Sequence, residues 1–318
     1  MKRVLLTGTG LLAAAALVLT GCSGTDQDTS GGKPTVVTST NVWGSVASAV
    51  AGDHAEVTAL FTNAGGDPHE FEPSASDSAA IVDASVIVMN GGGYDEYMSK
   101  AAENSKGTVV NAFETMEGDD HEDSHDSATA ESTSDDHDGH NHGEVNEHVF
   151  YNLTVVGQVA TKIADALAAK DSANAASYRE NAARFNTEID GLGADLADIK
   201  KAHDGTKVAQ TEPLAGYLLT SAGLDDVAPA GFTAAVEEGQ SPSAADRAAM
   251  QDLLTAGTVK AFIYNTQAVD PVTEALLTEA ERANVPVVKF TETLPDGVTS
   301  YIVWQQTQIA ALADALNA

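Results

Sequence analysis

The stretch GDPHEFEP at residues 66–73 lies between two segments of different hydrophobic period. Residues 57–61 before it are apolar and β-branched, which predicts a strand, and Ser74 with Asp77 after it forms the capping-box pattern that begins a helix. His69 therefore lies at the carboxyl end of an expected strand, where open α/β sheets bind their ligands. A single histidine there would favour a structural role, so its interpretation depends on the rest of the chain.

The same succession of strand and helix recurs along both halves of the chain. Segments rich in apolar and β-branched residues are separated by segments of helical period, and they lie at 35–38, 57–61, 85–89, 108–110, 207–210, 259–264 and 285–290. Further helices are expected to begin at Pro213, Ser243 and Pro271, and the last helix is expected to span about 300–316. Strands that alternate with helices predict an α/β fold with mainly parallel sheets covered by helices on both faces.

Two long helical patterns lie between these halves. The first covers residues 153–169, and the second continues from about 171 to 203 with apolar residues at steps of three and four. At 1.5 Å per residue the second helix is ~45 Å long, which is more than one small lobe can cover. We therefore expect an N-terminal lobe at 35–170 and a C-terminal lobe at 204–318, joined by one long rigid helix at 171–203.

A segment of biased composition interrupts the first lobe at 115–146. It contains no Lys or Arg, and its acidic, Ser-rich and Thr-rich sequence holds His121, His125, His137, His140 and His142. Such a segment cannot bury an apolar face, so we expect a disordered loop. Because neutral imidazole is a good zinc ligand, the loop is a candidate auxiliary site that gathers metal, and an inert solvated linker is the alternative.

The N-terminus has the features of a secretory signal. In residues 1–21, Lys2 and Arg3 precede an apolar stretch that is too short to span a bilayer comfortably, and the stretch runs into LTGC at 19–22, which resembles a bacterial lipobox. Cys22 is the only cysteine, which excludes an intramolecular disulfide and thiolate-rich metal sites. We expect a lipid-modified Cys22, a flexible tether at 22–34, and anchoring at the extracytoplasmic face of the cell membrane.

Acidic residues dominate the charge of the chain. There are 47 Asp and Glu against 16 Lys and Arg, a formal net charge of −31, which becomes −33 when Lys2 and Arg3 are removed with the signal. A strongly negative field disfavours nucleic acid and anionic substrates as partners and raises the local concentration of cations. Solubility in an extracellular setting is the alternative explanation, and composition does not distinguish the two.

Four strings of sequence, together with the lipobox, the His-rich loop and the long helix, bear a family resemblance. They are GDPHEFEPSASD at 66–77, NEHVFYNL at 146–153, TEPLAGYLLTSAGL at 211–224 and TETLPDGVTSYIVW at 291–304. They resemble the signatures of the zinc- and manganese-binding solute-binding lipoproteins of ABC importers, bacterial solute-binding protein family 9. The resemblance implies a monomer of two α/β lobes with a metal site in the cleft between them, and a membrane permease and its ATPase as partners.

The resemblance also implies a set of metal ligands. His69 and His148 match the family's first and second histidines, although His148 could merely end the His-rich loop. Glu212 matches the third ligand, which is usually His in zinc members and Glu in manganese members; its alternative is an acidic residue in the first turn of a helix. Glu292 stands where the family usually has Asp.

Two neutral imidazoles and two carboxylates suffice to neutralise a divalent cation without thiols. The oxygen of Glu212 favours manganese, whereas the His-rich loop favours zinc, and we predict zinc as the transported ion with manganese or iron as the alternative.

A binding protein is expected rather than an enzyme. The chain has no GxSxG string and no phosphate-binding glycine-lysine loop, and GGG at 91–93 indicates a tight turn near the cleft. A metal-dependent hydrolase with Glu70 as its general base and a surface adhesin are the competing classes.

Overall fold

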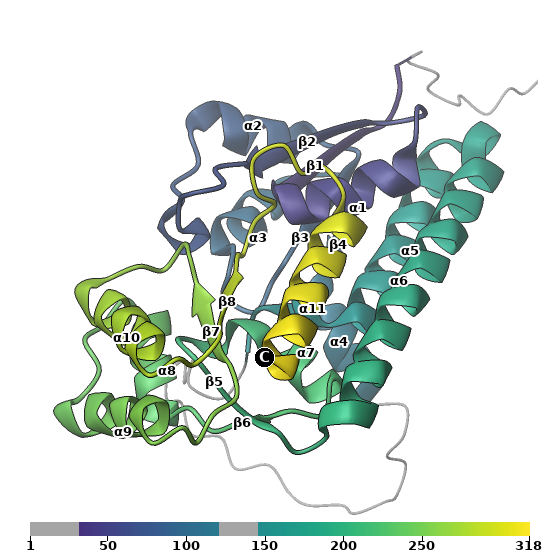
Figure 1. Cartoon of the computed structure of the whole chain (residues 1–318). Coiled ribbons are helices and arrows are strands. Elements are labelled where there is room, and N and C mark those ends of the chain that lie inside the picture. Colours follow the sequence, from purple (N-terminus) through teal and green to yellow (C-terminus); the bar gives the residue numbers. More distant parts are fainter. Residues whose placement is uncertain (1–31, 121–145) are drawn as a thin grey trace, which may run out of the picture. The chain divides into compact units, whose positions relative to one another are not determined.

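Two parallel four-stranded sheets organise the described residues, 32–120 and 146–318, of this computed structural model (Figure 1). The residues from Lys33 onward that the structure describes belong to one compact unit. The two-lobed α/β fold with a long helix between the lobes, expected from the alternation of strands and helices, is confirmed. The signal, Cys22 and the five histidines of the expected loop, His121, His125, His137, His140 and His142, lie outside the described residues.

The first sheet has the strand order β2-β1-β3-β4, with β1 at Thr35–Thr40, β2 at Glu56–Phe61, β3 at Val86–Met89 and β4 at Thr108–Asn111. Because side chains alternate across a strand, Val86 and Val88 join one hydrophobic cluster and Ile87 and Met89 join another on the opposite face. Helices pack on both faces: α1 (Asn41–Ala51) and α5 (Leu153–Lys170) on one, α2 (Ala75–Asp83) and α3 (Glu96–Ala102) on the other. The expected capping box of Ser74 and Asp77 begins α2.

The second sheet has the order β6-β5-β7-β8, with β5 at Lys207–Gln210, β6 at Asp225–Asp226, β7 at Phe262–Asn265 and β8 at Val287–Phe290. Its helices are α7 (Gly216–Ser221), α8 (Ala230–Glu237), α9 (Ala244–Thr255), α10 (Pro271–Arg282) and α11 (Tyr301–Asn317). The sequence patterns did not predict β6, because two acidic residues carry no hydrophobic period. Its pairing with β5 comes from the tertiary fold.

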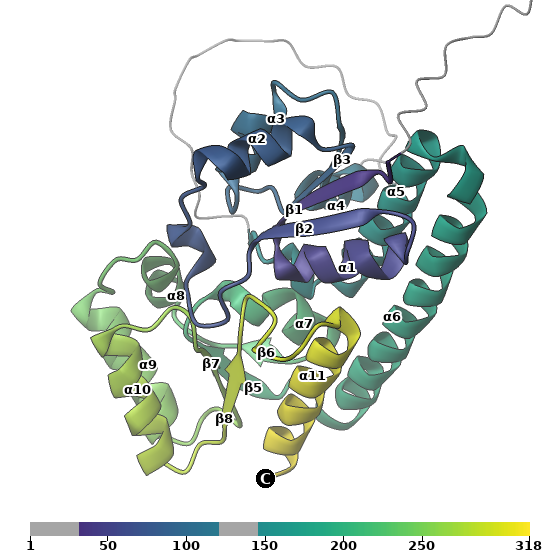
Figure 2. The same cartoon turned by 90° about the horizontal axis from the view of Figure 1, so that it is seen from above.

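The connecting helix α6 spans Ala175–His203, and Figure 2 shows it beside elements of both lobes. Its 29 residues correspond to ~44 Å of helix. It contacts α1 and α5 of the first lobe and α7 and α11 of the second. The buried face that makes these contacts consists of Tyr178, Ala182, Phe185, Ile189, Leu192, Leu196 and Ile199, all in a hydrophobic cluster that continues through both lobes. The two lobes therefore share apolar packing along this helix.

One expected boundary is wrong. The irregular segment was expected from residue 115, yet helix α4 spans Ala112–Asp120. Ala112 and Phe113 are buried in the large hydrophobic cluster, and Met116 packs against it, so the start of the acidic segment is held by contacts with α5. Three apolar residues next to a polar tract are too short a pattern to reveal a helix without its packing partner.

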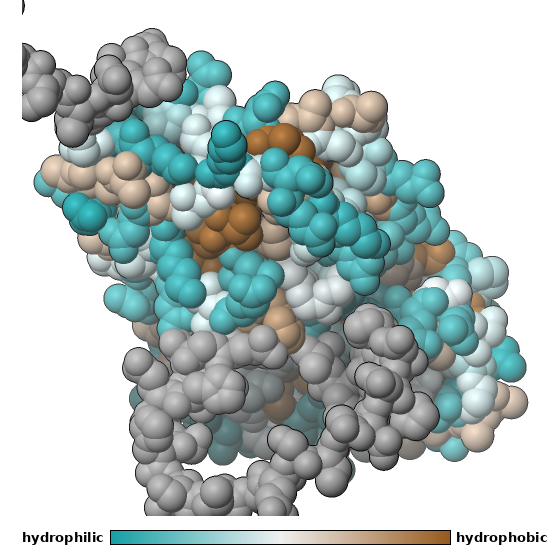
Figure 3. Space-filling model, turned by 180° about the vertical axis from the view of Figure 1, so that it is seen from behind, coloured by the Kyte–Doolittle hydropathy of each residue, from teal (hydrophilic) through white to brown (hydrophobic). Residues whose placement is uncertain are grey.

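Hydrophilic residues predominate among the coloured residues on the face shown in Figure 3, and apolar colour is confined to small areas. The large hydrophobic side chains that lie exposed in the described ranges are Val109, Val269 and Val303. Within the described ranges, no helix combines the length and the apolar character that crossing a membrane requires.

Candidate metal centre

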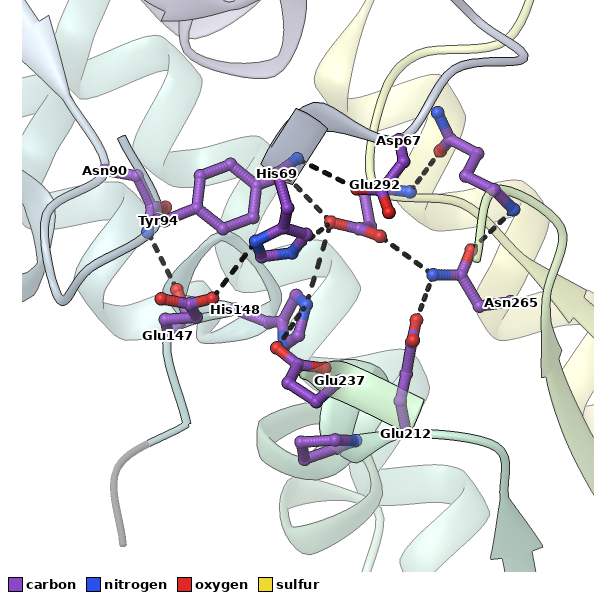
Figure 4. Close-up of polar contacts among 12 residues, drawn as sticks. Asp67, His69, Asn90, Tyr94, Glu147, His148, Glu212, Glu237, Asn265 and Glu292 are labelled. Atoms are coloured by element: carbon purple, nitrogen blue, oxygen red, sulfur yellow. Dashed lines mark hydrogen bonds and ion pairs between the residues drawn. The ribbon is translucent and has the colours of Figure 1, made fainter. Parts of the chain in front are cut away.

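Loops that follow strands of both sheets meet at one place, and Figure 4 shows the polar side chains that face one another there. The first lobe contributes His69, in the short 3-10 helix η1 (Pro68–Glu70) after β2, and His148, which caps η2 (Val149–Tyr151). The second lobe contributes residues that directly follow or end its strands and a helix, and these are Glu212, Glu237, Asn265 and Glu292. The carboxyl ends of parallel strands thus converge on a shared site.

His69 is held by its own turn. The Asp67 carboxylate accepts a hydrogen bond from the backbone N–H of His69 at 2.8 Å, and Pro68 occupies the first helical position, where no N–H is needed. The imidazole points at acidic groups on two sides, with Nε2 3.2 Å from Glu292 Oε2 and Nδ1 3.3 Å from Glu147 Oε1. Its side chain is 25% exposed, so it is the more accessible of the two histidines.

His148 is completely buried and oriented from behind. Asn146 Oδ1 lies 3.0 Å from both the backbone N and Nδ1 of His148. Since an amide oxygen only accepts, Nδ1 is assigned a proton, and the ring then directs Nε2 into the site. Asn146 is anchored to the second lobe in two ways. Its side-chain Nδ2 donates to Pro213 O at 2.7 Å, and its backbone carbonyl accepts from Tyr217 OH at 2.6 Å.

The Nε2 atom of His148 has no hydrogen-bond partner, although it is buried. The facing oxygens are Glu237 Oε1 at 3.6 Å and Glu292 Oε2 at 3.7 Å, beyond the range of a hydrogen bond. In a tetrahedral site with bonds of ~2.1 Å, neighbouring ligand atoms lie ~3.4 Å apart. The spacings at His148 therefore fit atoms that share a cation better than atoms that bond to each other.

Asn265, at the end of β7, links the two predicted carboxylate ligands. Its Nδ2 donates to Glu292 Oε1 at 2.8 Å and also to Glu212 Oε1, while its Oδ1 accepts from the backbone N–H of Gln267 at 2.9 Å. On the other side of Glu292, Tyr94 OH donates to Oε2 at 2.9 Å. These donors hold two buried carboxyl groups close together, at a position where an unpaired carboxylate would be costly.

A glycine turn places Tyr94. Gly91, Gly92 and Gly93 all have positive φ, at 77°, 69° and 107°, and a Cβ at Gly91 would collide with the side chain of Asn111. The tight turn near the site that was expected from the three glycines is therefore present. The Tyr94 ring contacts the His69 ring, with centroids 4.7 Å apart, so the turn supplies both a wall and a hydrogen bond to the site.

The two imidazoles are electrostatically coupled to the acids around them. Burial lowers the pKa of His69, but the hydrogen bond with Glu292 and the charges of Glu292 and Glu147 outweigh burial and raise that pKa to about 10. Burial also lowers the pKa of His148, and the charge of Glu237 with the contact to Glu292 raises it to about 9. The field therefore attracts positive charge.

The pKa values of the two buried acids, Glu292 and Glu212, shift in opposite directions. Burial raises the pKa of Glu292, but the nearby imidazoles of His148 and His69 overcome burial and hold the pKa well below its usual range. Burial and then the charge of Glu292 raise the pKa of Glu212 well above its usual range. The fold thus keeps Glu292 ionised between the imidazoles and disfavours a second full charge at Glu212.

The structure brings His69, His148 and Glu292, three of the four predicted ligands, close together. Glu212 faces the same space but is joined to Glu292 through Asn265. Within the described ranges, ligand atoms lie within 4.8 Å of one another in two groups: His69 with His148 and Glu237, and His69 with Asp67 and Glu292. Two further residues at this place, Glu237 and Asn265, were not identified from the sequence. Glu237 carries no signal beyond an acidic pair at the end of a helix, and Asn265 none beyond a polar residue that ends a strand.

Comparison with known proteins adds a family match. The family model described as ZnuA, zinc-uptake complex component A, periplasmic, matches residues 36–315. The manganese-binding lipoprotein MntA of Halalkalibacterium halodurans is 36% identical over 104 residues, which cover 31% of this chain and 34% of that protein. The zinc-binding lipoprotein AdcA of Streptococcus pneumoniae serotype 4 is 28% identical over 272 residues, which cover 83% of this chain and 50% of AdcA. The match thus spans at most half the length of these two relatives.

Solved structures share the fold. The binding protein FpvC of Pseudomonas aeruginosa, in complex with Mn2+, superimposes with a TM-score of 0.67 at 22% identity, covering 90% of this chain and 99% of FpvC. The likeness extends over both lobes and the connecting helix.

Proposed function

Because the chain belongs to the ZnuA family of periplasmic zinc-uptake components, we propose that it captures a divalent transition metal outside the cytoplasmic membrane and delivers it to the permease and ATPase of an ABC importer. The cation would be held by His69, His148 and Glu292, with Glu212 facing the same space. The buried and unpartnered Nε2 of His148, opposite carboxylate oxygens of the other lobe, is the observation that supports this best.

Capture and release follow from where the ligands come from. His69 and His148 belong to the first lobe and Glu292 to the second, so the bound ion ties the lobes together. Hydrogen bonds beside the site do the same in a weaker way, since Gln267 Nε2 donates to Gly66 O at 2.7 Å and Thr293 Oγ1 donates to Asn63 O at 3.3 Å. Any contact with a permease that separates the lobes would dismantle the coordination sphere and free the ion.

Metal titration of the purified protein tests the proposal. Wild type should bind one Zn2+ in competition with a chelating dye, and His148→Ala should weaken binding by about 100-fold or more, because one of four ligands contributes roughly a quarter of a ~10–16 kcal/mol zinc interaction. His203→Ala is the matched control, since His203 lies in the last turn of α6. Equal affinities of wild type and the His148 variant, with both folded by circular dichroism, would contradict the proposal.

Zinc remains the proposed physiological ion. The His-rich segment favours it, the oxygen of Glu212 favours manganese, and the relatives include proteins named for each metal. Tight zinc binding in vitro does not decide, because zinc outranks manganese at most nitrogen and oxygen sites. The decisive experiment deletes the gene and starves the cells with a chelator. Rescue by manganese alone, at concentrations where zinc has no effect, would reverse the choice of ion.

Lipid anchoring through Cys22 also remains a proposal, since that residue lies outside the described residues. Its support is the lipobox at 19–22. Cys22→Ala should move the protein from the membrane fraction into the soluble fraction, and tight retention in the membrane would exclude the anchor.

A metal-dependent hydrolase is the alternative class. Glu70, the general base that such an enzyme would use, is exposed and belongs to neither group of clustered ligand atoms in the described ranges. The string HEDSH at 121–125 has the letters of the HExxH zinc-protease pattern, but it lies in the acidic segment outside the described residues, and its sequence surroundings lack the apolar period of a helix.

A further inference from the structure

We infer that Glu237, the last residue of α8, is a direct ligand of the captured metal, together with His69 and His148. The inference rests on the proposed function and extends it, because it assigns a coordinating carboxylate outside the four residues predicted from the sequence. It also assigns helix α8 to the site.

The geometry places Glu237 on the open side of the buried imidazole. Its Oε1 lies 3.6 Å from His148 Nε2, and one ligand atom from each of Glu237, His148 and His69 lies within 4.8 Å of the others. Neighbouring ligand atoms of a tetrahedral zinc ion are ~3.4 Å apart, so the separation suits two atoms on one cation. His148 Nε2 supplies the independent observation: it is fully buried, lacks a hydrogen bond, and faces this carboxylate (Figure 4).

Local structure explains how Glu237 is positioned, yet it does not explain why an acid stands there. Phe232 and Val236 bury one face of α8 in the hydrophobic cluster of the second lobe, which fixes the end of the helix over the site. A carboxylate at a helix C-terminus is unfavourable, because that end carries partial negative charge. In the described ranges, Glu237 forms its ion pair with the imidazole of His148. A cation between the two would satisfy both groups.

Glu212 is placed differently. Its Oε1 accepts a hydrogen bond from Asn265 Nδ2, which also donates to Glu292 and so holds the two side chains together. Neither group of clustered ligand atoms includes it. A set of His69, His148, Glu237 and Glu292 already balances a divalent cation, with two neutral imidazoles and two negative carboxylates. Glu237 therefore occupies the coordinating position, and Glu212 stands behind Asn265.

The test compares Glu237→Gln with Glu238→Gln in the folded protein. Glu238 is adjacent and exposed, so its substitution removes the same charge without reaching the site. Zn2+ affinity is measured by competition with a chelating dye, and the visible absorption of Co2+ in the same site reports a change in the ligand set. Loss of a ligand should cost at least the ~10-fold that is typical of residues supporting a ligand, whereas Glu238→Gln should resemble wild type.

Two results would overturn the inference. One is an affinity of Glu237→Gln within about two-fold of Glu238→Gln, since a lost ligand exceeds that. The other is weaker binding with an unchanged Co2+ spectrum, which would mean that Glu237 acts only through its charge. A wild-type protein that binds no metal, or a His148→Ala variant that binds as wild type does, would instead defeat the proposed function itself.

Discussion

The two lobes contribute different chemistry to one site. The first lobe presents the imidazoles of His69 and His148, whereas the second presents the carboxylates of Glu212, Glu237 and Glu292. The buried ring of His148 is oriented by Asn146 behind it. Carboxylates clustered in a buried place repel one another, so the second lobe also supplies Asn265, and Tyr94 reaches across from the first lobe.

This difference indicates what a bound metal ion would add. In the free protein the negative side attracts protons to the imidazole side, which raises the pKa of both histidines. A bound divalent cation would replace those protons and satisfy both sides together. Each of the following predictions changes the imidazoles, the carboxylates or the charge on one of these two groups.

Acidification should have the largest effect. With a pKa of about 10 for His69 and about 9 for His148, both imidazoles carry protons at pH 7 to 8 in the free protein, and metal must displace them. Two released protons make the apparent affinity rise ~100-fold per pH unit, or ~10,000-fold from pH 6 to 8. Calorimetry in buffers of different ionisation enthalpy counts the protons. A nearly flat profile between pH 7 and 8 would mean that the histidines have ordinary pKa values.

The same shift affects the stability of the free protein. A histidine whose pKa is raised on folding stabilises the fold fully below its unfolded pKa of ~6.5. That contribution is lost as the pH rises through about 9 for His148 and about 10 for His69. The midpoint of thermal unfolding without metal should therefore fall over this range, and bound metal should reduce the fall.

Glu292→Gln should have the next largest effect, because it removes the charge that faces both imidazoles. Metal affinity should fall by about 100-fold, the contribution expected of one ligand in four. The pKa of both histidines should also drop, so that fewer protons are released on binding. Asp296→Asn, in the turn after β8, is the control. Unchanged proton release would show that Glu292 is not what raises the histidine pKa values.

Asn265→Leu should have a smaller effect, because it leaves every proposed ligand in place and removes only the amide that orients Glu292 and Glu212. A fall in affinity of ~10-fold to 100-fold is typical for residues that support ligands. The free protein should also lose roughly 1–3 kcal/mol of unfolding free energy, since buried carboxylates lose a donor. Chemical denaturation with and without metal measures both effects. Asn104→Leu, at an exposed turn, should leave affinity unchanged.

Deletion of residues 118–143 should have the smallest effect on the tight site. All proposed ligands lie outside this segment, so one high-affinity ion should remain, and only weaker additional zinc binding should disappear. Titration calorimetry separates the two phases. Loss of the high-affinity phase would move the main site from the lobes into the His-rich segment.

Much of the fold could be predicted from the sequence, because it depends on short-range patterns. Alternating strand and helix periods predicted two parallel sheets and a helix between them, and the end of one strand pointed to His69. The candidates His148, Glu212 and Glu292 came from the family resemblance of the strings around them. The β6 strand and the start of α4 escaped prediction, since each depends on a partner elsewhere in the chain.

Tertiary structure alone decided how these groups relate. In sequence, Glu237 is an acid at the end of a helix and Asn265 a polar residue at the end of a strand. Burial of Phe232 and Val236 brings Glu237 over His148 from the other lobe, and pairing of β7 beside β5 and β8 sets Asn265 between Glu212 and Glu292. The sequence determined which donors exist and at which strand ends they stand. Which donors share an ion is a matter of distance, because coordination acts over about 2 Å and only long-range packing brings atoms that close.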